Sequence, residues 1–246
     1  MKLSVLIPAY NEALNLPDTI SSFYSALNNN NIDHELLVVN DNSSDDTETV
    51  IKTLQQTIPT LRTIVNPPPY NGFGLAIRKG LENFSGDCVA IVMADMSDSP
   101  EDLVRFYKVF TEQKVDCVFG NRFIKGGKVV DYPKKKLFLN RIVNNMIGFV
   151  FKIKYDDFTN AFKLYSKHTI EGLHPLLSPH FNLTVELSLK AIVRGYSYAV
   201  VPNSWKNRKY GVSNLKIREM GSRYFFIVLY CLIEKYFSKG DFEKKW

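Results

Sequence analysis

Polar and charged side chains follow several short apolar runs of the sequence, at the points where buried strands would end. Tyr10-Asn11-Glu12 follows the first run, Asn40-Asp41 the second, and Asp95 a later one, with Asp98 three residues beyond it. Asn121-Arg122 follows the last of these runs. Carboxylates suit a ribose and a hard divalent cation, and an arginine suits phosphate oxygens. If these residues converge on one crevice, they suggest that it binds a ribose, a metal ion and phosphates.

Five apolar runs rich in β-branched residues predict the strands that hold these positions. They are Leu3–Pro8, Glu35–Val39, Leu61–Val65, Cys88–Ala94 and Cys117–Gly120. Between the first two, Ile20, Phe23, Tyr24 and Leu27 follow the spacing of one helix face. Alternating strands and helices predict an α/β sheet with helices on both faces. Ligands of such sheets bind beyond the carboxyl ends of the strands, where the carboxylates and the arginine stand.

Beyond Gly126-Gly127 the alternation stops. Leu137–Ile153 has a polar residue at about every fourth position, which predicts a helix with a narrow polar stripe and a broad apolar side. The remaining predicted elements are a strand at Phe162–Tyr165, a helix at Leu183–Arg194, a strand at Ser197–Val201 and a last helix at Leu215–Phe237. We therefore expect a catalytic domain over residues 1–214. Residues 215–246 would form a C-terminal amphipathic, membrane-facing helix and tail.

The composition is that of a folded chain. Of 246 residues, 45% are hydrophobic and 23% are charged, so disorder of the whole chain is excluded. The three cysteines, Cys88, Cys117 and Cys231, lack CxxC spacing, which favours a reducing cytoplasm over a disulfide framework. The longest apolar stretch, Tyr224–Ile233, has ten residues. Because a membrane-spanning helix needs roughly 20 apolar residues, none is expected.

The net charge of +6 is concentrated in two segments. Lys125, Lys128, Lys134, Lys135, Lys136 and Arg141 form one segment, and Lys206, Arg208 and Lys209 form the other. Such clusters suit polyanions. Since lysines and arginines also flank the two apolar-faced helices, we expect peripheral contact with an anionic membrane. The alternative is that both helices simply pack on the core. No nucleic-acid partner is expected.

Several blocks resemble one enzyme family. Val5-Leu6-Ile7-Pro8-Ala9-Tyr10-Asn11-Glu12 and Val39-Asn40-Asp41-Asn42-Ser43-Ser44-Asp45-Asp46-Thr47 resemble the opening of inverting family 2 glycosyltransferases with the GT-A fold. The stretch 71–80 resembles the glycine-rich helix start of that family, and Ala94-Asp95 with Ser99-Pro100-Glu101-Asp102 resembles the region around its metal-binding aspartate. Stretches 120–127, 157–163 and 205–213 resemble its dolichyl-phosphate mannose synthases and bacterial polyprenyl-phosphate glycosyltransferases. The resemblance implies a Rossmann-like nucleotide-diphospho-sugar transferase sheet.

The resemblance also implies where the nucleotide sugar binds. Pro8, Tyr10, Glu12 and Asp41 match positions that contact the nucleotide. A carboxylate such as that of Asp41 can accept hydrogen bonds from a base, while the other three can form the wall around the base and ribose. The alternative for the acidic residues is helix capping or turn formation.

The metal site implied by the resemblance departs from the usual pattern. Ala94 and Asp95 match the donor and metal position, which implies Mg²⁺ or Mn²⁺ as the cofactor. Met93 stands where the family has its first aspartate, and Ser97 stands where a glutamine is often found. Asp98 is expected to supply the missing oxygen ligand. The alternative is that Asp98 only caps the helix that follows it.

Two arginines are expected at the diphosphate. The planar guanidinium of Arg122 suits bidentate phosphate binding, with a surface salt bridge as the alternative. Arg208 resembles the basic residue that closes over the donor diphosphate, although Asn214 stands where a lysine is expected.

Two acidic residues match positions on the acceptor side, namely Asp157 and Glu186. Asp157 is expected to act as a base or to orient the attacking oxygen. The alternative is a structural role as the partner of Lys163 or Arg141.

These implications favour an inverting glycosyltransferase that moves mannose or glucose from GDP-mannose or UDP-glucose to a polyprenyl (dolichyl or undecaprenyl) phosphate. The enzyme would be cytoplasmic and peripheral on the inner face of the membrane. An alternative acceptor is a sugar hydroxyl in cell-surface polysaccharide synthesis, for which Asp157 would be needed as a true base. A non-catalytic nucleotide-sugar-binding protein is a further alternative, because Met93 and Asn214 depart from the pattern. A nucleotidyltransferase is excluded, since its glycine-rich loop is absent after the first strand.

Overall fold

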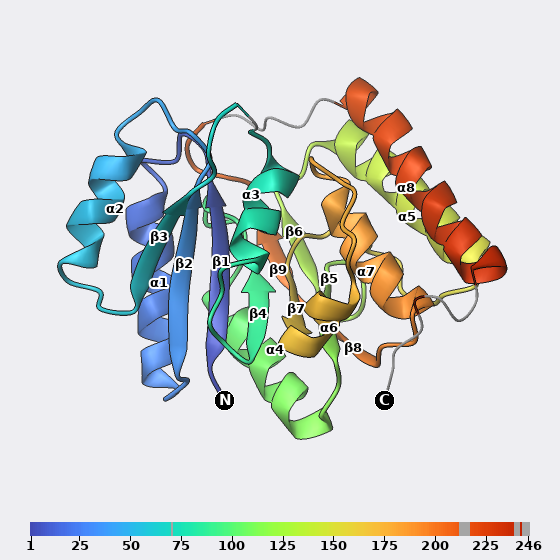
Figure 1. Ribbon diagram of the computed structural model, residues 1–246, viewed down its shortest axis with the longest axis horizontal. Coiled ribbons are helices and arrows are strands. Elements are labelled where there is room, and N and C mark those ends of the chain that lie inside the picture. The colour runs from blue at the N-terminus through green and yellow to red at the C-terminus, as the bar shows by residue number, and fades with distance from the viewer. Residues whose placement is uncertain (70, 212–216, 239–241, 243–246) are drawn as a thin grey trace.

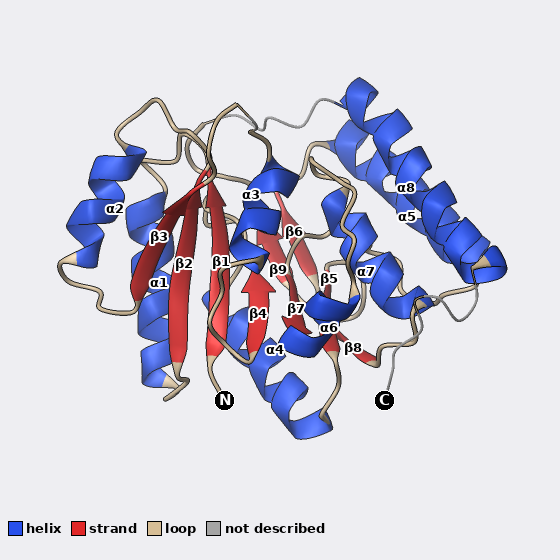
Figure 2. Cartoon of the chain, viewed as in Figure 1, coloured by secondary structure: helices blue, strands red, loops and turns tan. Residues whose placement is uncertain are grey.

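Buried strands and amphipathic helices alternate along the chain and build a central sheet covered on both faces (Figures 1 and 2). The computed structural model describes residues 1–69, 71–211, 217–238 and 242. The strands are β1 Leu3–Ala9, β2 His34–Asn40, β3 Leu61–Val65, β4 Cys88–Ile91, β5 Cys117–Asn121, β6 Lys128–Val130, β7 Lys163–Ser166, β8 Tyr198–Pro202 and β9 Ser204–Lys206. The helices are α1 Leu16–Asn29, α2 Thr47–Gln55, α3 Phe73–Leu81, α4 Pro100–Gln113, α5 Lys134–Phe151, α6 Lys167–Gly172, α7 Leu183–Val193 and α8 Ile217–Phe237.

The central sheet has seven strands in the order β3-β2-β1-β4-β7-β5-β8. β7 is antiparallel to β4 and β5, between which it lies, and the other neighbouring strands are parallel. Strands β6 and β9 form a separate parallel pair. The carboxyl ends of β1, β2, β4 and β5 therefore meet at one edge of the sheet, where open α/β sheets bind ligands.

The central strands are buried on both sides because a layer of helices covers each face of the sheet. In β1, Leu3, Val5 and Ile7 pack in the layer that contains α1, α2 and α4. Leu6 packs in the opposite layer, with apolar residues of α3, α5, α7 and α8. Burial on both faces explains why these strands are unbroken apolar runs in the sequence. The residues that follow them are thus fixed to a rigid framework.

The predicted α/β class is confirmed, and the five predicted strands are present. The largest difference is at β4, which ends at Ile91 because the chain then turns, and the backbone N–H of Met93 donates to Asp98 Oδ2 (3.0 Å). The sequence does not predict β6 and β9, since each has three residues and carries a lysine at one end.

The predicted amphipathic helices are present as α5 and α8. The expected domain boundary between residues 214 and 215 lies outside the described residues, as do Asn214 and Leu215. Arg194, the residue that caps the C-terminus of α7, donates to both carboxylate oxygens of Glu234 in α8 (2.6 and 2.9 Å), and both side chains are buried. Lys235 Nζ donates to the carbonyl oxygen of Phe151 at the end of α5 (2.6 Å). α8 is thereby tied to both helices, and α5 lies beside it (Figure 1).

Both helices also expose apolar side chains. We define the α5 stripe as Leu139, Ile142, Met146 and Phe149, and the α8 stripe as Phe225, Leu229, Ile233 and Tyr236, all exposed. Their spacing of three or four residues places each set on one helix face. None of the helices in the described part of the chain is both long and apolar enough to cross a bilayer.

Candidate active site

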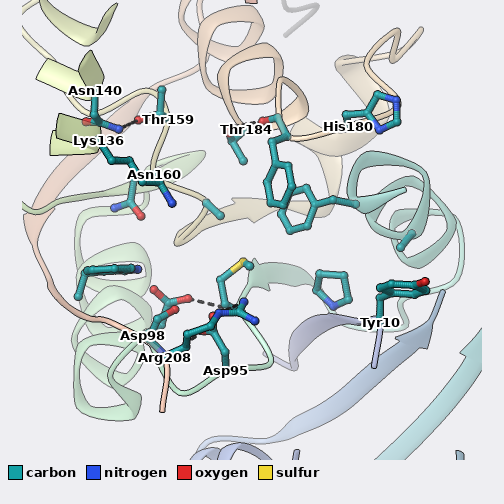
Figure 3. Close-up of a pocket in the computed structure, with 18 of the residues that line it drawn as sticks. Tyr10, Asp95, Asp98, Lys136, Asn140, Thr159, Asn160, His180, Thr184 and Arg208 are labelled. Atoms are coloured by element: carbon teal, nitrogen blue, oxygen red, sulfur yellow. Dashed lines mark hydrogen bonds and ion pairs between the residues drawn. The ribbon is translucent and has the colours of Figure 1, made fainter. Parts of the chain in front are cut away.

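A cavity of about 800 Å³ lies at the carboxyl ends of β1, β2, β4 and β5, beneath α5, α7 and α8. Its size falls within the roughly 300–1,000 Å³ of small-molecule sites. Of the residues expected at the site, those that line the cavity are Pro8, Tyr10, Glu12, Asp41, Asp95, Asp98, Arg122 and Arg208. Ala94 is buried behind it, where its carbonyl oxygen accepts a hydrogen bond from Thr19 Oγ1 (2.8 Å). Figure 3 shows Asp95, Asp98 and Arg208 along one wall, with Tyr10 and His180 at the far end.

The end of the cavity near Tyr10 is built by the turns after β1 and β2. Tyr10 is 42% exposed, whereas Asp41 is buried. The two carboxylate oxygens of Asp41 accept hydrogen bonds from Asn66 Nδ2 (2.6 Å) and from the backbone N–H of Gly72 (2.8 Å). Gly72 has a φ of +146°, and a Cβ there would lie 2.9 Å from the carbonyl oxygen of Pro179. Asp41 and a glycine thus hold the start of α3 against the end of β2.

Arg208 connects the two acidic positions expected at the donor. Its guanidinium forms an ion pair with Asp95 Oδ2 (2.6 Å) and a longer one with Glu12 Oε1 (3.3 Å). Glu12 also accepts a hydrogen bond from Asn15 Nδ2 (2.6 Å). Burial raises the pKa of Glu12, and the hydrogen bond from Asn15 and the charge of Arg208 offset part of this. The structure therefore brings together one arginine and two carboxylates that the sequence places far apart.

Asp98 is buried in the wall of the cavity, close to Asp95. Burial raises its pKa to about 7, and the negative charge of Asp95 adds to this shift, whereas the N–H of Met93 opposes it. The alternative role as a helix cap is wrong, because Ser99 is the N-cap of α4 and its Oγ accepts from the N–H of Asp102 (3.3 Å). Two neighbouring carboxylates thus share a pocket in which both cannot easily be charged at once.

The carboxylates of Asp95 and Asp98 suit a hard divalent cation. In the described part of the chain, no group of three or more histidine, cysteine, aspartate or glutamate side chains could hold a metal ion. Mg²⁺ and Mn²⁺ sites that carry a nucleotide need only one or two carboxylates, since phosphate oxygens and water complete the shell. The thioether of Met93, which also lines the cavity, is a poor ligand for such ions. These two carboxylate ligands therefore fit a cation that is bound together with a diphosphate.

Arg122 and Asp157 form a buried pair beside the cavity. Arg122 Nε donates to Asp157 Oδ2 (2.9 Å) and a terminal nitrogen donates to Oδ1 (2.6 Å), and the backbone N–H of Arg122 also donates to Oδ2 (3.0 Å). Burial lowers the pKa of Arg122, but the charge of Asp157 more than offsets this, so the arginine stays charged. Arg122 lines the cavity, and Asp157 stands behind it with an exposed fraction of 0%. The carboxylate thus orients the guanidinium.

The structural partners considered as an alternative for Asp157, namely Lys163 and Arg141, bond to other groups. Lys163 instead donates to the carbonyl oxygens of Phe158 and Thr184 (2.7 and 3.1 Å) and to that of Asn160. Arg141 pairs with Asp156. Asp156 and Asp157 are adjacent on one loop, but Asp156 pairs with Arg141 and Asp157 pairs with Arg122. The surface salt bridge considered for Arg122 is also wrong, since its pair is buried.

The first turns of α5 form a further wall. Lys136, Leu139, Asn140 and Val143 line the cavity at i, i+3, i+4 and i+7 spacing. Burial lowers the pKa of Lys136, and the positive charges of Arg122 and Arg208 add to the shift. Asn140 Nδ2 donates to Thr159 Oγ1 (2.7 Å), which joins α5 to the loop that carries Asp157. Figure 3 shows Lys136, Asn140 and Thr159 across the cavity from Asp95.

Several cavity residues are not expected from the sequence, namely Tyr132, Asn140, Thr159, Asn160, His180, Thr184, Trp205 and Tyr224. The shared helical face of Lys136 and Asn140 is a signal that could reveal one of them. Thr159, Asn160 and Trp205 lie in the stretches that resemble the family, but the resemblance gives none of them a role. Glu186, expected near the acceptor, is fully buried and accepts hydrogen bonds from the N–H groups of Leu177 and Ser178 (2.8 and 2.7 Å), which is a structural role.

Comparisons with known proteins agree with this geometry. Residues 4–173 match the model of the glycosyl transferase family 2. The chain is 29% identical over 216 residues to the polyprenol monophosphomannose synthase of Mycolicibacterium smegmatis, covering 86% of this chain and 80% of that protein. It is 30% identical to the dolichol-phosphate mannosyltransferase of Pyrococcus furiosus over 88% of this chain, but it spans only 60% of the length of that relative.

The fold is similar to that of a solved enzyme. The glucosyl-3-phosphoglycerate synthase of Mycobacterium tuberculosis, in complex with Mn²⁺, UDP-glucose and phosphoglyceric acid, superposes with a TM-score of 0.69. The match covers 95% of this chain and 79% of that enzyme at 18% identity, so it bears on the fold alone. Because the family model matches residues 4–173, which is more than half of the chain, the chain belongs to glycosyl transferase family 2.

Proposed function

We propose that the chain is an inverting hexosyltransferase that moves mannose or glucose from GDP-mannose or UDP-glucose to the phosphate of a polyprenyl phosphate. The observation that carries the proposal is one cavity with an acidic end, formed by Asp95 and Asp98, and a basic end, formed by Lys136 and Arg122. It lies beneath two helices with exposed apolar stripes. A nucleotide sugar with its metal suits the acidic end. A phosphate on an apolar chain suits the basic end. The names of the two relatives, which act on polyprenol and dolichol phosphates, support the same acceptor class.

The donor would lie along the ends of β1, β2 and β4, with its base near Tyr10 and Asp41. Asp95 and Asp98 would hold Mg²⁺ or Mn²⁺, which neutralises the charge that develops on the departing diphosphate. Arg208, which pairs with Asp95, would add a positive charge beside the diphosphate. The bond between the anomeric carbon and the diphosphate breaks as an acceptor oxygen bonds to that carbon from the opposite face. This geometry inverts the configuration of the sugar.

The acceptor would present its phosphate to Lys136 and Arg122. A phosphate monoester has a second pKa near 6, so it is mostly ionised at neutral pH and needs no base. A sugar hydroxyl would need one. Because both oxygens of Asp157 are bonded to Arg122, this carboxylate is better suited to orienting the arginine than to accepting a proton. The Arg122–Asp157 pair therefore favours a phosphate acceptor over a sugar hydroxyl.

We also propose that the chain works at the inner face of a membrane and binds it peripherally. The α5 and α8 stripes are exposed, and Lys134 and Lys135 are exposed where α5 begins. Apolar helix faces with flanking lysines are the composition of interfacial helices, which lie in the plane of anionic membranes. Such an orientation would bring the basic end of the cavity to the depth of lipid phosphates.

The test is transfer of labelled sugar from GDP-mannose and from UDP-glucose to undecaprenyl or dolichyl phosphate in detergent with Mn²⁺. We expect lipid-linked product with one of the two donors and loss of that product in EDTA. Product formed only on oligosaccharide hydroxyls would contradict the proposed acceptor. Nucleotide binding without transfer to either acceptor would favour the non-catalytic alternative.

A further inference from the structure

The small sheet of β6 and β9 is fixed to the loop that carries Asp98. Trp205, the middle residue of β9, forms an antiparallel bridge with Asp98. The backbone N–H of Lys206 donates to the carbonyl oxygen of Ser97 in the same loop (3.0 Å). On its other side, Trp205 is aligned with Val129 of β6. Trp205, which lines the cavity, is therefore held at the acidic end.

Tyr132 lines the same cavity and contacts the basic end. It follows β6 by two residues, and Asp131 between them has a φ of +55°, so the chain turns sharply there. The centroid of the Tyr132 ring lies 5.9 Å from the guanidinium carbon of Arg122 and 6.0 Å from Nζ of Lys136. These distances are those of cation–π contacts. Tyr132 is thus held beside both cations.

The rings of Tyr132 and Trp205 are in contact, with centroids 4.7 Å apart and planes inclined at 52°. They form one aromatic surface between Asp98 and the two cations. Burial raises the pKa of the Tyr132 hydroxyl, and the charge of Arg122 offsets part of this, so the hydroxyl is neutral at neutral pH. An uncharged surface is unsuited to a diphosphate or its metal. It suits the uncharged part of the donor, which is the sugar.

We propose that Trp205 and Tyr132 form the hexose seat, the surface on which the transferred sugar lies. This inference rests on the proposed function. In-line transfer requires the hexose to lie between the departing diphosphate, near Asp98, and the acceptor phosphate, near Arg122 and Lys136. The two rings span the same interval. A hexose has C–H groups on the faces of its ring, and aromatic side chains pack against such apolar faces.

The test compares each nucleotide sugar with the nucleotide that lacks the sugar, namely GDP-mannose with GDP and UDP-glucose with UDP, by calorimetric titration in Mn²⁺. In Trp205→Ala the Kd of the nucleotide sugar should rise by about ten-fold, a factor that corresponds to about 1.4 kcal/mol. The Kd of the nucleotide alone should stay the same, because the seat contacts only the sugar. Trp205→Phe should bind the nucleotide sugar more tightly than Trp205→Ala, since it keeps an aromatic face.

Tyr10→Ala is the matched comparison, because it removes an aromatic ring from the opposite end of the cavity (Figure 3). Since Tyr10 is assigned to the base, this variant should weaken the nucleotide sugar and the nucleotide by the same factor. Equal weakening of both ligands in Trp205→Ala would overturn the hexose seat and leave the proposed function intact. If the unaltered chain binds neither pair of ligands, the proposed function fails, and the seat with it.

A second measurement leaves the seat unaltered. The sequence has two tryptophans, Trp205 and Trp246, so Trp246→Phe makes Trp205 the only one. Its fluorescence emission should change more on binding of the nucleotide sugar than on binding of the nucleotide, because only the sugar covers the indole ring. Identical emission spectra for the two complexes would contradict the proposal, whether or not Trp205→Ala folds.

Discussion

At the scale of single residues, the loop after β4 concentrates negative charge beside the cavity. Asp95 is paired with Arg208. Burial raises the pKa of Asp98, and repulsion by the negative charges of Asp95 and Asp102 raises it further. The nearby charge of Arg122 only partly offsets this repulsion. A divalent cation would relieve it, which gives a physical reason for metal binding at a site that has lost the usual first aspartate to Met93.

Asp95→Asn should lower kcat by on the order of 10²-fold, because the variant loses a charged metal ligand that stabilises the departing diphosphate. The measurement is sugar transfer in saturating Mn²⁺. Asp18→Asn, an exposed change in α1 with the same loss of charge, serves as the control and should leave kcat unchanged. Equal rates for the two variants would remove Asp95 from the mechanism.

Asp98 should make the stability of the metal-free protein depend on pH. Its pKa in the folded state is about 7, above the usual value of 3.8. Between these values the folded state binds more protons than the unfolded state, so stability falls as pH rises from about 4 to about 7. Denaturant unfolding at several pH values should show this loss, of on the order of 1–4 kcal/mol, reduced in Asp98→Asn. Identical pH profiles for the variant and the unaltered chain would contradict the assignment.

Asp157→Asn should lower the rate of transfer to a phosphate acceptor without changing the shape of the pH–rate profile. The reason is that the variant weakens the orientation of Arg122 but removes no base. It should also lower stability by about 1–3 kcal/mol, since a buried charged hydrogen-bond partner of Arg122 is lost. If the acidic limb of the profile disappears in the variant, Asp157 acts as a base after all.

At the scale of secondary-structure elements, one face of α5 packs on the protein and the opposite face is exposed. Its inner face holds the loop of residues 156–160, because Asn140 and Asn144 contact Thr159 and Arg141 pairs with Asp156. Its outer face is the exposed α5 stripe. Movement of this helix would therefore disturb the loop that carries Asp157, which in turn orients Arg122.

The three lysines at the start of α5 should have two different functions. Lys134 and Lys135 are exposed, whereas Lys136 lines the cavity. The double change to Gln at 134 and 135 should weaken liposome binding by about 1 kcal/mol per charge and leave transfer in detergent unchanged. Lys136→Gln should raise the KM for polyprenyl phosphate and leave hydrolysis of the donor unchanged.

Calorimetric titration with the nucleotide diphosphate provides the control for both variants. Because the lysines are assigned to the acceptor and to the membrane, the Kd for the nucleotide should be the same in all three proteins. A weaker Kd in Lys136→Gln with undiminished acceptor use would place this lysine over the donor instead.

The sequence predicts the helices and strands better than it predicts which side chains pair with one another. The β1 and β2 strands are recognisable because burial on both faces makes them continuous apolar runs. The bidentate pairing of Arg122 with Asp157 joins residues 35 positions apart, and nothing in the residues around either side chain predicts that pairing. Side chains on loops, such as Thr159 and His180, have no periodic pattern at all. Their place in the cavity follows from tertiary packing, which a single sequence does not encode locally.

At the scale of the whole molecule, the α5 and α8 stripes are exposed on two helices that also line the cavity, and Lys134 and Lys135 are exposed at the start of α5. We expect the protein to bind liposomes that contain anionic lipid and to be released as ionic strength rises, because salt screens lysines near a charged surface. Sedimentation with liposomes from about 0.05 to 0.5 M salt is the measurement. Liposomes of neutral lipid should bind less. Equal sedimentation with both lipids at all salt concentrations would contradict the electrostatic part of the proposal.

The position of β7 in the sheet has a consequence for the timing of folding during synthesis. β7 fills the place between β4 and β5, yet it emerges from the ribosome after both. Until Lys163–Ser166 arrives, β4 presents an unpaired edge, which is a template for aggregation. Ser166 follows Asn121, the end of β5, by 45 residues; at about 5–20 residues per second the nascent chain waits for several seconds. Nascent chains stalled before β7 should therefore depend on chaperones that cover exposed strands, and chains stalled after β8 should not.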